Sequence, residues 1–220
     1  MRTAAFIPVK LQNERFPGKN IKKFRDGTPL ICFVQKTLLQ CASVDEVNVY
    51  CSDDAIREYM VPGVNFCRRE KKYDEDKMTV NDMHASILEK SEADIYMIVH
   101  CTSPFIRSDT IERGIALVKE GKYDSIAVGK RVQEFIWKDN EPFNFTREYI
   151  PRTQDLEPYY IETNGMYIFS KESMEKNHCR IGSHPFMMEL SDEEAVDIDY
   201  YEDFVKAQMI LDAREQNGGV

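Results

Sequence analysis

Short apolar runs alternate along the chain with polar segments in which apolar residues recur at helical spacing. The apolar runs are brief, rich in β-branched residues and bounded by polar or turn residues, which is typical of buried strands. They cover residues 4–9, 46–51, 64–67, 95–100, 125–128, 165–169 and 186–190. The segments with helical spacing are residues 29–41, 53–60, 79–90, 108–120 and 200–214. This alternation predicts an α/β fold, a mostly parallel sheet with helices on both faces.

The segment at about residues 131–163 breaks the alternation. It is rich in aromatic and charged residues and has no clear helical period. We therefore predict a single domain over residues 1–220 with an insertion that forms a flap, a hairpin or a subunit contact. The last residues, 217–220, are expected to fray.

Composition and charge exclude several classes of protein. The net charge of −9 argues against nucleic acid as the main partner, because phosphate binding requires a basic face. No apolar run approaches the ~20 residues of a membrane span, and the early run is too short for a secretory signal. No two of the six cysteines have the close spacing of zinc or thioredoxin-like sites. These features predict a soluble cytoplasmic protein.

The charge is distributed unevenly. Residues 1–30 carry seven lysines and arginines against two acids, whereas residues 185–204 carry eight acids and no lysine or arginine. Such runs are commonly solvated faces, but they also suit an anion-binding loop beside a metal-binding segment. Doubly wound sheets bind ligands outside the carboxyl ends of their strands. The loops expected there are residues 10–20, 52–54, 102–104 and 197–199.

The first of these loops concentrates cations. Lys10, Arg15 and Lys19 lie within ten residues of one another, and a Pro-Gly turn precedes Lys19. The loop matches neither the Walker pattern nor the dinucleotide fingerprint. Cations and backbone amides in a bent loop suit a triphosphate, whose charge must be neutralised during transfer. An ordinary solvated loop is the alternative interpretation.

Asp197 and Asp199 precede the last predicted helix. On an extended segment this spacing points both carboxylates to one face. Hard oxygen ligands of this kind suit Mg²⁺ held jointly by protein and phosphates. Two acids ahead of a helix are also favoured by the helix dipole, so capping alone is the alternative interpretation.

Several short motifs occur in an order that resembles one family. They are Ile7-Pro8 through Pro17-Gly18-Lys19-Asn20-Ile21, Cys51-Ser52-Asp53-Asp54, Thr102-Ser103-Pro104 followed by Arg107, Arg152-Thr153-Gln154-Asp155-Leu156, Asn164-Gly165-Met166-Tyr167-Ile168, and Asp197-Ile198-Asp199 with Glu202-Asp203-Phe204. Over roughly residues 4–211 the chain resembles the CMP-sugar synthetases, the acylneuraminate cytidylyltransferase family. The resemblance implies a Rossmann-like nucleotidyltransferase fold, usually assembled as a homodimer.

The resemblance also implies a reaction and a set of site residues. The anomeric hydroxyl of an acidic keto sugar, a sialic acid-like nonulosonic acid, would attack the α-phosphate of CTP and release pyrophosphate, with Mg²⁺ as cofactor. The matching residues are Lys10, Arg15 and Lys19 as catalytic cations; Asn13, Asn20, Ser52 and Arg69 (or its neighbour Arg68) for the nucleotide; His100, Thr102, Arg152, Gln154 and Asn164 for the acceptor; and Asp197 and Asp199 for the metal.

The sequence departs from the family's pattern at some of these positions. Lys10 stands where the family usually has arginine, Asn13 replaces a serine that can contact phosphate, and Glu14 adds a negative charge beside the anion site. His100 stands at a position associated with sugar recognition, where the family often has glutamine. These departures leave two alternatives: a cytidylyltransferase for an eight-carbon sugar acid or a phosphonate, and a non-catalytic CTP-binding relative.

Overall fold

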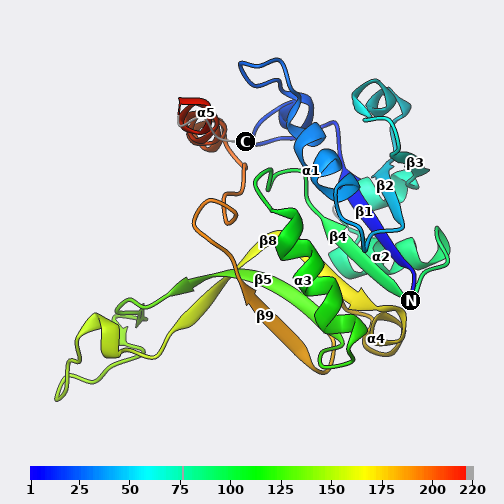
Figure 1. The fold of residues 1–220 in the computed structure, drawn as a ribbon. Coiled ribbons are helices and arrows are strands. Elements are labelled where there is room, and N and C mark those ends of the chain that lie inside the picture. Colours follow the sequence, from blue (N-terminus) through cyan, green and yellow to red (C-terminus); the bar gives the residue numbers. More distant parts are fainter. Residues whose placement is uncertain (76, 217–220) are drawn as a thin grey trace.

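A seven-stranded sheet forms the centre of the protein, with strand order β3-β2-β1-β4-β8-β5-β9 (Figure 1). The computed structural model describes residues 1–75 and 77–216, so the predicted fraying at 217–220 lies outside the described residues. The strands of this sheet are β1 (Thr3–Val9), β2 (Glu46–Cys51), β3 (Asn65–Arg68), β4 (Ile95–Val99), β5 (Ser125–Val132), β8 (Tyr159–Ser170) and β9 (Pro185–Glu189). Neighbours pair in parallel except around β8, which is antiparallel to both β4 and β5. The prediction of a mostly parallel sheet is confirmed.

The hydrophobic pattern does not predict the reversed direction of β8. This direction follows from the path of the chain, because the segment after β5 leaves the sheet and returns to the same edge. β5 and β8 then pair from Ser125–Phe169 to Val132–Tyr159, with a register shift between Ala127 and Val128. Both strands therefore run beyond the ends that the apolar runs predict, into the segment expected to be an insertion.

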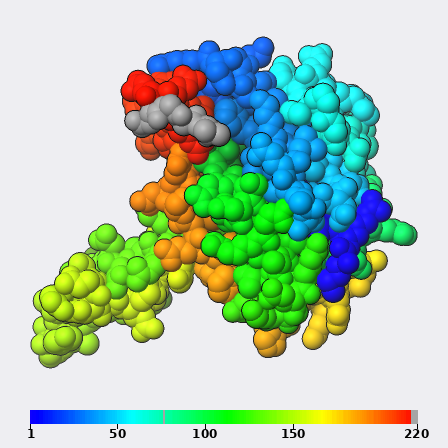
Figure 2. All heavy atoms as spheres, in the orientation of Figure 1, coloured from blue at the N-terminus to red at the C-terminus, as the bar shows by residue number. Residues whose placement is uncertain are grey.

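The segment between β5 and β8 protrudes from the body as an arm (green to yellow in Figures 1 and 2). Its short hairpin pairs β6 (Trp137–Lys138) with β7 (Glu141–Pro142). Large apolar side chains on the arm are exposed, among them Trp137, Phe143, Tyr149 and Ile150. We call residues 133–158 the arm below.

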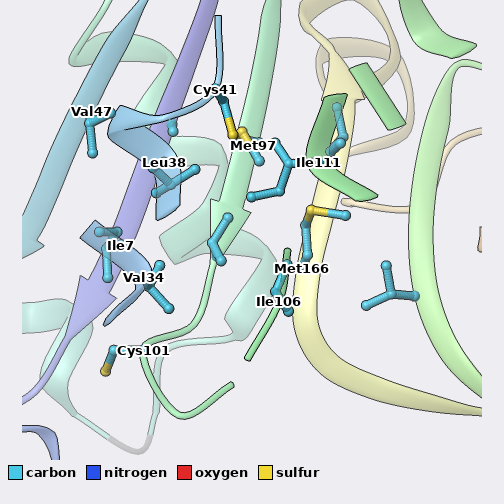
Figure 3. Close-up of a cluster of buried hydrophobic side chains, with 14 of the residues drawn as sticks. Ile7, Val34, Leu38, Cys41, Val47, Met97, Cys101, Ile106, Ile111 and Met166 are labelled. Atoms are coloured by element: carbon cyan, nitrogen blue, oxygen red, sulfur yellow. The ribbon is translucent and has the colours of Figure 1, made fainter. Parts of the chain in front are cut away.

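Helices cover both faces of the sheet, as predicted. On one face, α1 (Leu30–Leu39) and α3 (Ser108–Lys119) pack Leu38 and Ile111 against the strands (Figure 3). On the other face, α2 (Val80–Ala85) and α4 (Lys171–Asn177) contribute Met83 and Met174 to a second cluster around Tyr96. In the described ranges 1–75 and 77–216, no helix has the length and apolar character needed to cross a membrane.

Two predicted helices differ from the structure in type and length. Residues 53–60 form a single 3₁₀ segment, Asp54–Tyr59, capped by the Asp53 side chain. Residues 79–90 divide into α2, which begins with the expected capping box of Thr79 and Asp82, and a 3₁₀ turn, Ser86–Glu89. Short segments of this kind gain few backbone hydrogen bonds, so tertiary contacts rather than intrinsic propensity decide their geometry.

The last helix, α5 (Tyr201–Gln216), lies against the first loop at the carboxyl ends of the strands. Phe204 of α5 stacks on Phe24 with ring centroids 4.3 Å apart and meets Phe16 edge-on at 5.9 Å. Burial of such rings contributes roughly 1.5–3 kcal/mol each. This aromatic cluster fixes the basic loop next to the acidic segment that leads into α5.

Gly165 provides a stability test for the strand beneath the candidate site. A Cβ atom at this position of β8 would lie 2.8 Å from Cδ1 of Ile106 and 3.1 Å from Oγ of Ser103. Replacing Gly165 with alanine is therefore expected to lower the free energy of unfolding by about 1–3 kcal/mol, the usual cost of overpacking. Urea unfolding measures the change, and an unaltered midpoint would show that the neighbouring side chains move away freely.

Candidate active site

The carboxyl ends of the parallel strands surround a cavity of about 510 Å³. Lys10 follows β1 and Ser52 follows β2, so the order of the strands places both residues on the same edge of the sheet. The lining is mostly polar and charged: Lys10, Leu11, Gln12, Ser52, Asp53, Asp54, Arg68, Lys71 and Asp74. A volume of this size lies within the range of small-molecule sites.

The basic loop and the acidic segment meet beside this cavity. The ammonium of Lys19 is buried and donates to Oδ1 of Asp199 at 2.9 Å and to the carbonyl oxygen of Ile198 at 2.8 Å. Arg15 donates through Nη1 to the other carboxylate oxygen of Asp199 at 2.6 Å. Gly18, with φ of 70°, bends the loop into the short helix that begins at Lys19. The structure thus joins three of the predicted site residues, Lys19 and Arg15 lying 180 and 184 positions from Asp199.

The carboxylate of Asp197 has an oxygen that can still accept a hydrogen bond or bind a cation. Its Oδ1 atom is buried and finds no hydrogen-bond partner among the described residues. Burial raises the pKa of this carboxyl, the hydrogen bond from Thr102 opposes the rise, and the charge of Asp199 adds to it. The main chain of Ile198 also donates to the carbonyl oxygen of Thr102 at 2.8 Å, which fixes the acidic segment to the loop after β4.

The carboxylates of Asp197 and Asp199 fit a magnesium ion that takes most of its ligands from phosphate and water oxygens. No three His, Cys, Asp or Glu side chains in residues 1–75 and 77–216 are grouped closely enough to hold a metal by themselves. Mg²⁺ is commonly bound by one or two carboxylates together with phosphate and water oxygens. Asp197, whose buried oxygen has no partner among the described residues, and Asp199 can supply these carboxylates.

Two of the residues predicted for the nucleotide, Asn20 and Ser52, are linked to Lys10 by hydrogen bonds. Asn20 donates through Nδ2 to the carbonyl oxygen of Lys10 at 2.8 Å, and its own Oδ1, like that of Asn13, is buried without a partner among the described residues. Ser52 donates to the carboxylate of Asp74, and Lys10 Nζ donates to the carbonyl oxygen of Asp74 at 3.0 Å. These contacts join Asn20 directly, and Ser52 through Asp74, to Lys10.

Arg68 and Arg69 have different surroundings. Arg69 is buried and donates to the carbonyl oxygen of Val9 at 2.9 Å and to the carboxylate of Asp74. Arg68 is about half exposed, lines the cavity and pairs with Asp54. Asp74 was not among the predicted site residues, and no local signal marks it, because its contacts depend on how residues 71–74 fold over the sheet.

The acceptor residues predicted after β4 and in β8 lie near a group of aromatic and charged side chains. His100 follows β4, and its Nε2 is buried without a partner among the described residues. Asn164 accepts a hydrogen bond from the hydroxyl of Tyr167 at 3.1 Å. The guanidinium carbon of Arg180 lies 3.7 Å from the centre of the Tyr167 ring, and its Nη2 pairs with Glu162 at 3.2 Å. Arg180 and Glu162 were not among the predicted residues.

Arg152 and Gln154 are not brought to this edge of the same chain. Both lie on the arm, where Arg152 pairs with Asp155 at 2.7 Å and the carbonyl oxygen of Gln154 accepts from Gln133 at 3.1 Å. The arm extends away from the body (Figure 2). Their predicted contact with an acceptor therefore requires a site outside their own chain.

His100 should make stability depend on pH between about 4 and 6.5. Burial lowers the pKa of His100 to about 4, with further lowering by the charges of Arg180 and Lys19. The unfolded chain takes up the proton near 6.5, so acidification through this interval favours unfolding. Replacing His100 with glutamine is expected to reduce the stability lost between pH 6.5 and 4 by up to about 3 kcal/mol. Urea unfolding at both pH values measures this difference, and equal losses in both proteins would contradict the assignment.

A doubly wound sheet whose strand ends join a cation-rich loop to a pair of carboxylates is an α/β protein with a Rossmann-like nucleotidyltransferase fold. The chain belongs to the Cytidylyltransferase family, whose model matches residues 4–217.

Named relatives and solved structures agree with this assignment. The chain is 25% identical to N-acylneuraminate cytidylyltransferase A of Danio rerio over 89% of this chain and 47% of the relative. It is 28% identical to 3-deoxy-manno-octulosonate cytidylyltransferase 2 of Hydrogenovibrio crunogenus over 56% of this chain and 50% of the relative. The chain thus spans about half the length of the curated relatives it matches first.

The fold is also that of CMP:2-keto-3-deoxy-manno-octonic acid synthetase complexed with CTP. That structure superposes with a TM-score of 0.73 at 17% identity, over 97% of this chain and 100% of the other. A 4-diphosphocytidyl-2C-methyl-D-erythritol synthase from Anaerococcus prevotii gives a TM-score of 0.69 at 12% identity, over 96% of each chain. At these identities the two structures establish the fold alone.

Proposed function

We propose that the protein transfers CMP from CTP to the anomeric hydroxyl of an acidic keto sugar and releases pyrophosphate. The observation that carries this proposal is the buried ammonium of Lys19, which is held by Asp199 and belongs to the same loop as Lys10, a residue that lines the cavity. Membership of the Cytidylyltransferase family supports CTP as the donor. The names of the relatives support an acidic sugar as the acceptor.

The side chains of this site would act mainly by placing positive charge. Lys10 and Lys19 would bind oxygens of the triphosphate, where charge accumulates as the sugar hydroxyl attacks the α-phosphorus and pyrophosphate leaves. Arg15, more exposed than Lys19, would bind outer phosphate oxygens. A magnesium ion held by Asp197 and Asp199 would supply Lewis acidity at the same phosphates. The proton of the attacking hydroxyl would pass to solvent.

For the acceptor we propose a nine-carbon acid of the sialic type, with an eight-carbon acid or a phosphonate as the alternatives. Relatives with both kinds of sugar acid in their names match the chain at low identity. Because one hydroxyl or acetamido group is distinguished by a few side chains, the acceptor must be identified by assay. Pyrophosphate release with CTP and Mg²⁺ should be compared across sialic, legionaminic, pseudaminic, 3-deoxy-manno-octulosonic and phosphonic acids. Tight CTP binding by calorimetry with no turnover on any acceptor would favour a non-catalytic CTP-binding protein.

We further propose that a second copy of this chain is a partner and that the arm forms the contact. The arm exposes Trp137, Phe143 and Ile150 and carries two residues predicted to bind the acceptor, Arg152 and Gln154. A second chain would cover the exposed apolar side chains and receive those residues at its own site.

This proposal predicts the effect of a charge on the arm. Replacing Ile150, which is 65% exposed, with aspartate is expected to convert a dimer into a monomer and to lower transferase activity at least about tenfold. Light scattering gives the mass and pyrophosphate release gives the rate. Met209→Asp, at a similarly exposed position on α5, serves as the matched control. A monomeric unaltered protein with full activity would contradict the proposal.

A further inference from the structure

Asp74 is the acidic side chain most firmly fixed at the wall of the cavity. It ends the short 3₁₀ turn Lys71–Asp74 that follows the edge strand β3. One carboxylate oxygen accepts from Arg69 and the other from the hydroxyl of Ser52. Its side chain is 24% exposed and lines the cavity, so one part of the carboxylate is held from behind while another faces the open space.

The partners of Asp74 are themselves fixed. Arg69 is only 5% exposed, and its Nη2 also donates to the carbonyl oxygen of Val9 at 2.9 Å. Ser52 directly follows the buried end of β2. Side chains that are held in this way keep their hydrogen-bonding geometry without further loss of entropy when a ligand binds.

The other acidic side chains that line the cavity, Asp53 and Asp54, make different contacts. Asp53 caps a 3₁₀ turn by accepting from the main-chain nitrogen of Ala55. Asp54 is more than half exposed and pairs with two guanidinium groups, those of Arg57 and Arg68. Among the described residues, each oxygen of the Asp74 carboxylate has one donor. A carboxylate has about four acceptor positions, so Asp74 can accept from a ligand as well.

The charge of Asp74 restricts which part of a nucleotide can approach it. A triphosphate is repelled by a carboxylate, whereas Lys10, which lines the same cavity, attracts it. The neutral ribose and base are the parts that remain for Asp74, and of these only the base differs between CTP and UTP. Cytosine carries an exocyclic amino group that donates hydrogen bonds, and carboxylates are suited to accept them. Uracil has a carbonyl oxygen at that position and would place two acceptors opposite each other.

We propose that Asp74 is a specificity-determining residue that accepts a hydrogen bond from the amino group of cytosine and thereby selects CTP over UTP. This inference rests on the proposed use of CTP and extends it to a residue outside the matched sequence motifs. The carboxylate, fixed by Arg69 and Ser52, distinguishes the two nucleotides because cytosine donates a hydrogen bond at this position, whereas the carbonyl oxygen of uracil can only accept one.

The test is calorimetric binding of CTP and UTP, each with Mg²⁺, to the full chain and to Asp74→Asn. The unaltered protein is expected to bind CTP at least about tenfold more tightly than UTP, as expected for a hydrogen bond to a charged acceptor. In Asp74→Asn the ratio of the two dissociation constants is expected to fall below about three, because an amide can either donate or accept. Asp74→Glu restores a carboxylate and should recover a preference for CTP.

Asp192→Asn is the matched control, since it makes the same chemical change at an 84% exposed carboxylate that does not line the cavity. It is expected to leave the ratio of the two dissociation constants within about twofold. An unchanged ratio in Asp74→Asn, or equal binding of CTP and UTP by the unaltered protein, would overturn the inference and leave nucleotide binding intact. Failure of the unaltered protein to bind either nucleotide would instead overturn the proposed function, and the inference with it.

Discussion

Replacing Lys19 with methionine is expected to lower kcat/KM for CTP by about 10²–10³-fold. The ammonium of Lys19 is buried and is held by Asp199 and by the carbonyl oxygen of Ile198, so it cannot be replaced by a mobile neighbour. Removing one preorganised hydrogen-bond donor from an oxyanion hole has an effect of this size, and Lys19 would stabilise developing negative charge in the same way. The rate of pyrophosphate release at limiting CTP measures it.

The control for this substitution is Lys23→Met, in the same basic stretch but exposed to solvent. It is expected to change kcat/KM less than about twofold, because exposed charges are screened by water and salt. Unfolding midpoints of both variants separate a loss of charge from a loss of structure, since Lys19 also joins the first loop to Asp199. Equal activity of the two variants would remove Lys19 from the proposed chemistry.

Replacing Asp199 with alanine is the second change with a large expected effect. Asp199 orients both Lys19 and Arg15 and lies next to Asp197, whose buried oxygen is unpaired among the described residues. Activity is expected to fall at least about 100-fold at limiting Mg²⁺, with part of the loss recovered as Mg²⁺ is raised. A titration of pyrophosphate release against Mg²⁺ measures both effects.

Asp192→Asn is the control for the acidic segment, because its side chain is 84% exposed and pairs only with Lys130 in the described part of the chain. Its magnesium dependence should match that of the unaltered protein. Full activity of Asp199→Ala at limiting Mg²⁺ would contradict the assignment of a metal to this carboxylate.

The sequence predicted the elements whose pattern is strongly local. The second strand was expected at residues 46–51 and is found at Glu46–Cys51, because a short, mostly apolar segment bounded by polar residues is a sufficient signal for a buried strand. The helix α4 was missed although Ser170 caps it and accepts from the nitrogen of Ser173, since seven residues give little periodicity. The direction of β8 was missed because it depends on where the arm returns to the sheet.

The site was predictable to the extent that topology determines it. Strand ends in a doubly wound sheet share one edge, so the meeting of Lys19 with Asp199 follows from the order of elements and from their charges. Asp74 and Arg180 could not be found in the same way. Each reaches its partners from a short turn or loop whose path is set by packing, over 22 positions to Ser52 and 18 to Glu162.

The most direct test of the account follows the α-phosphate of CTP. The protein should be incubated with CTP labelled at the α-phosphorus, Mg²⁺ and each acid of the acceptor panel, and the products separated by charge. With one class of acid, the label is expected to move into a CMP–acceptor product in an amount equal to the pyrophosphate released. If CTP binds but the label remains in CTP with every acid of the panel, the proposed transfer is contradicted.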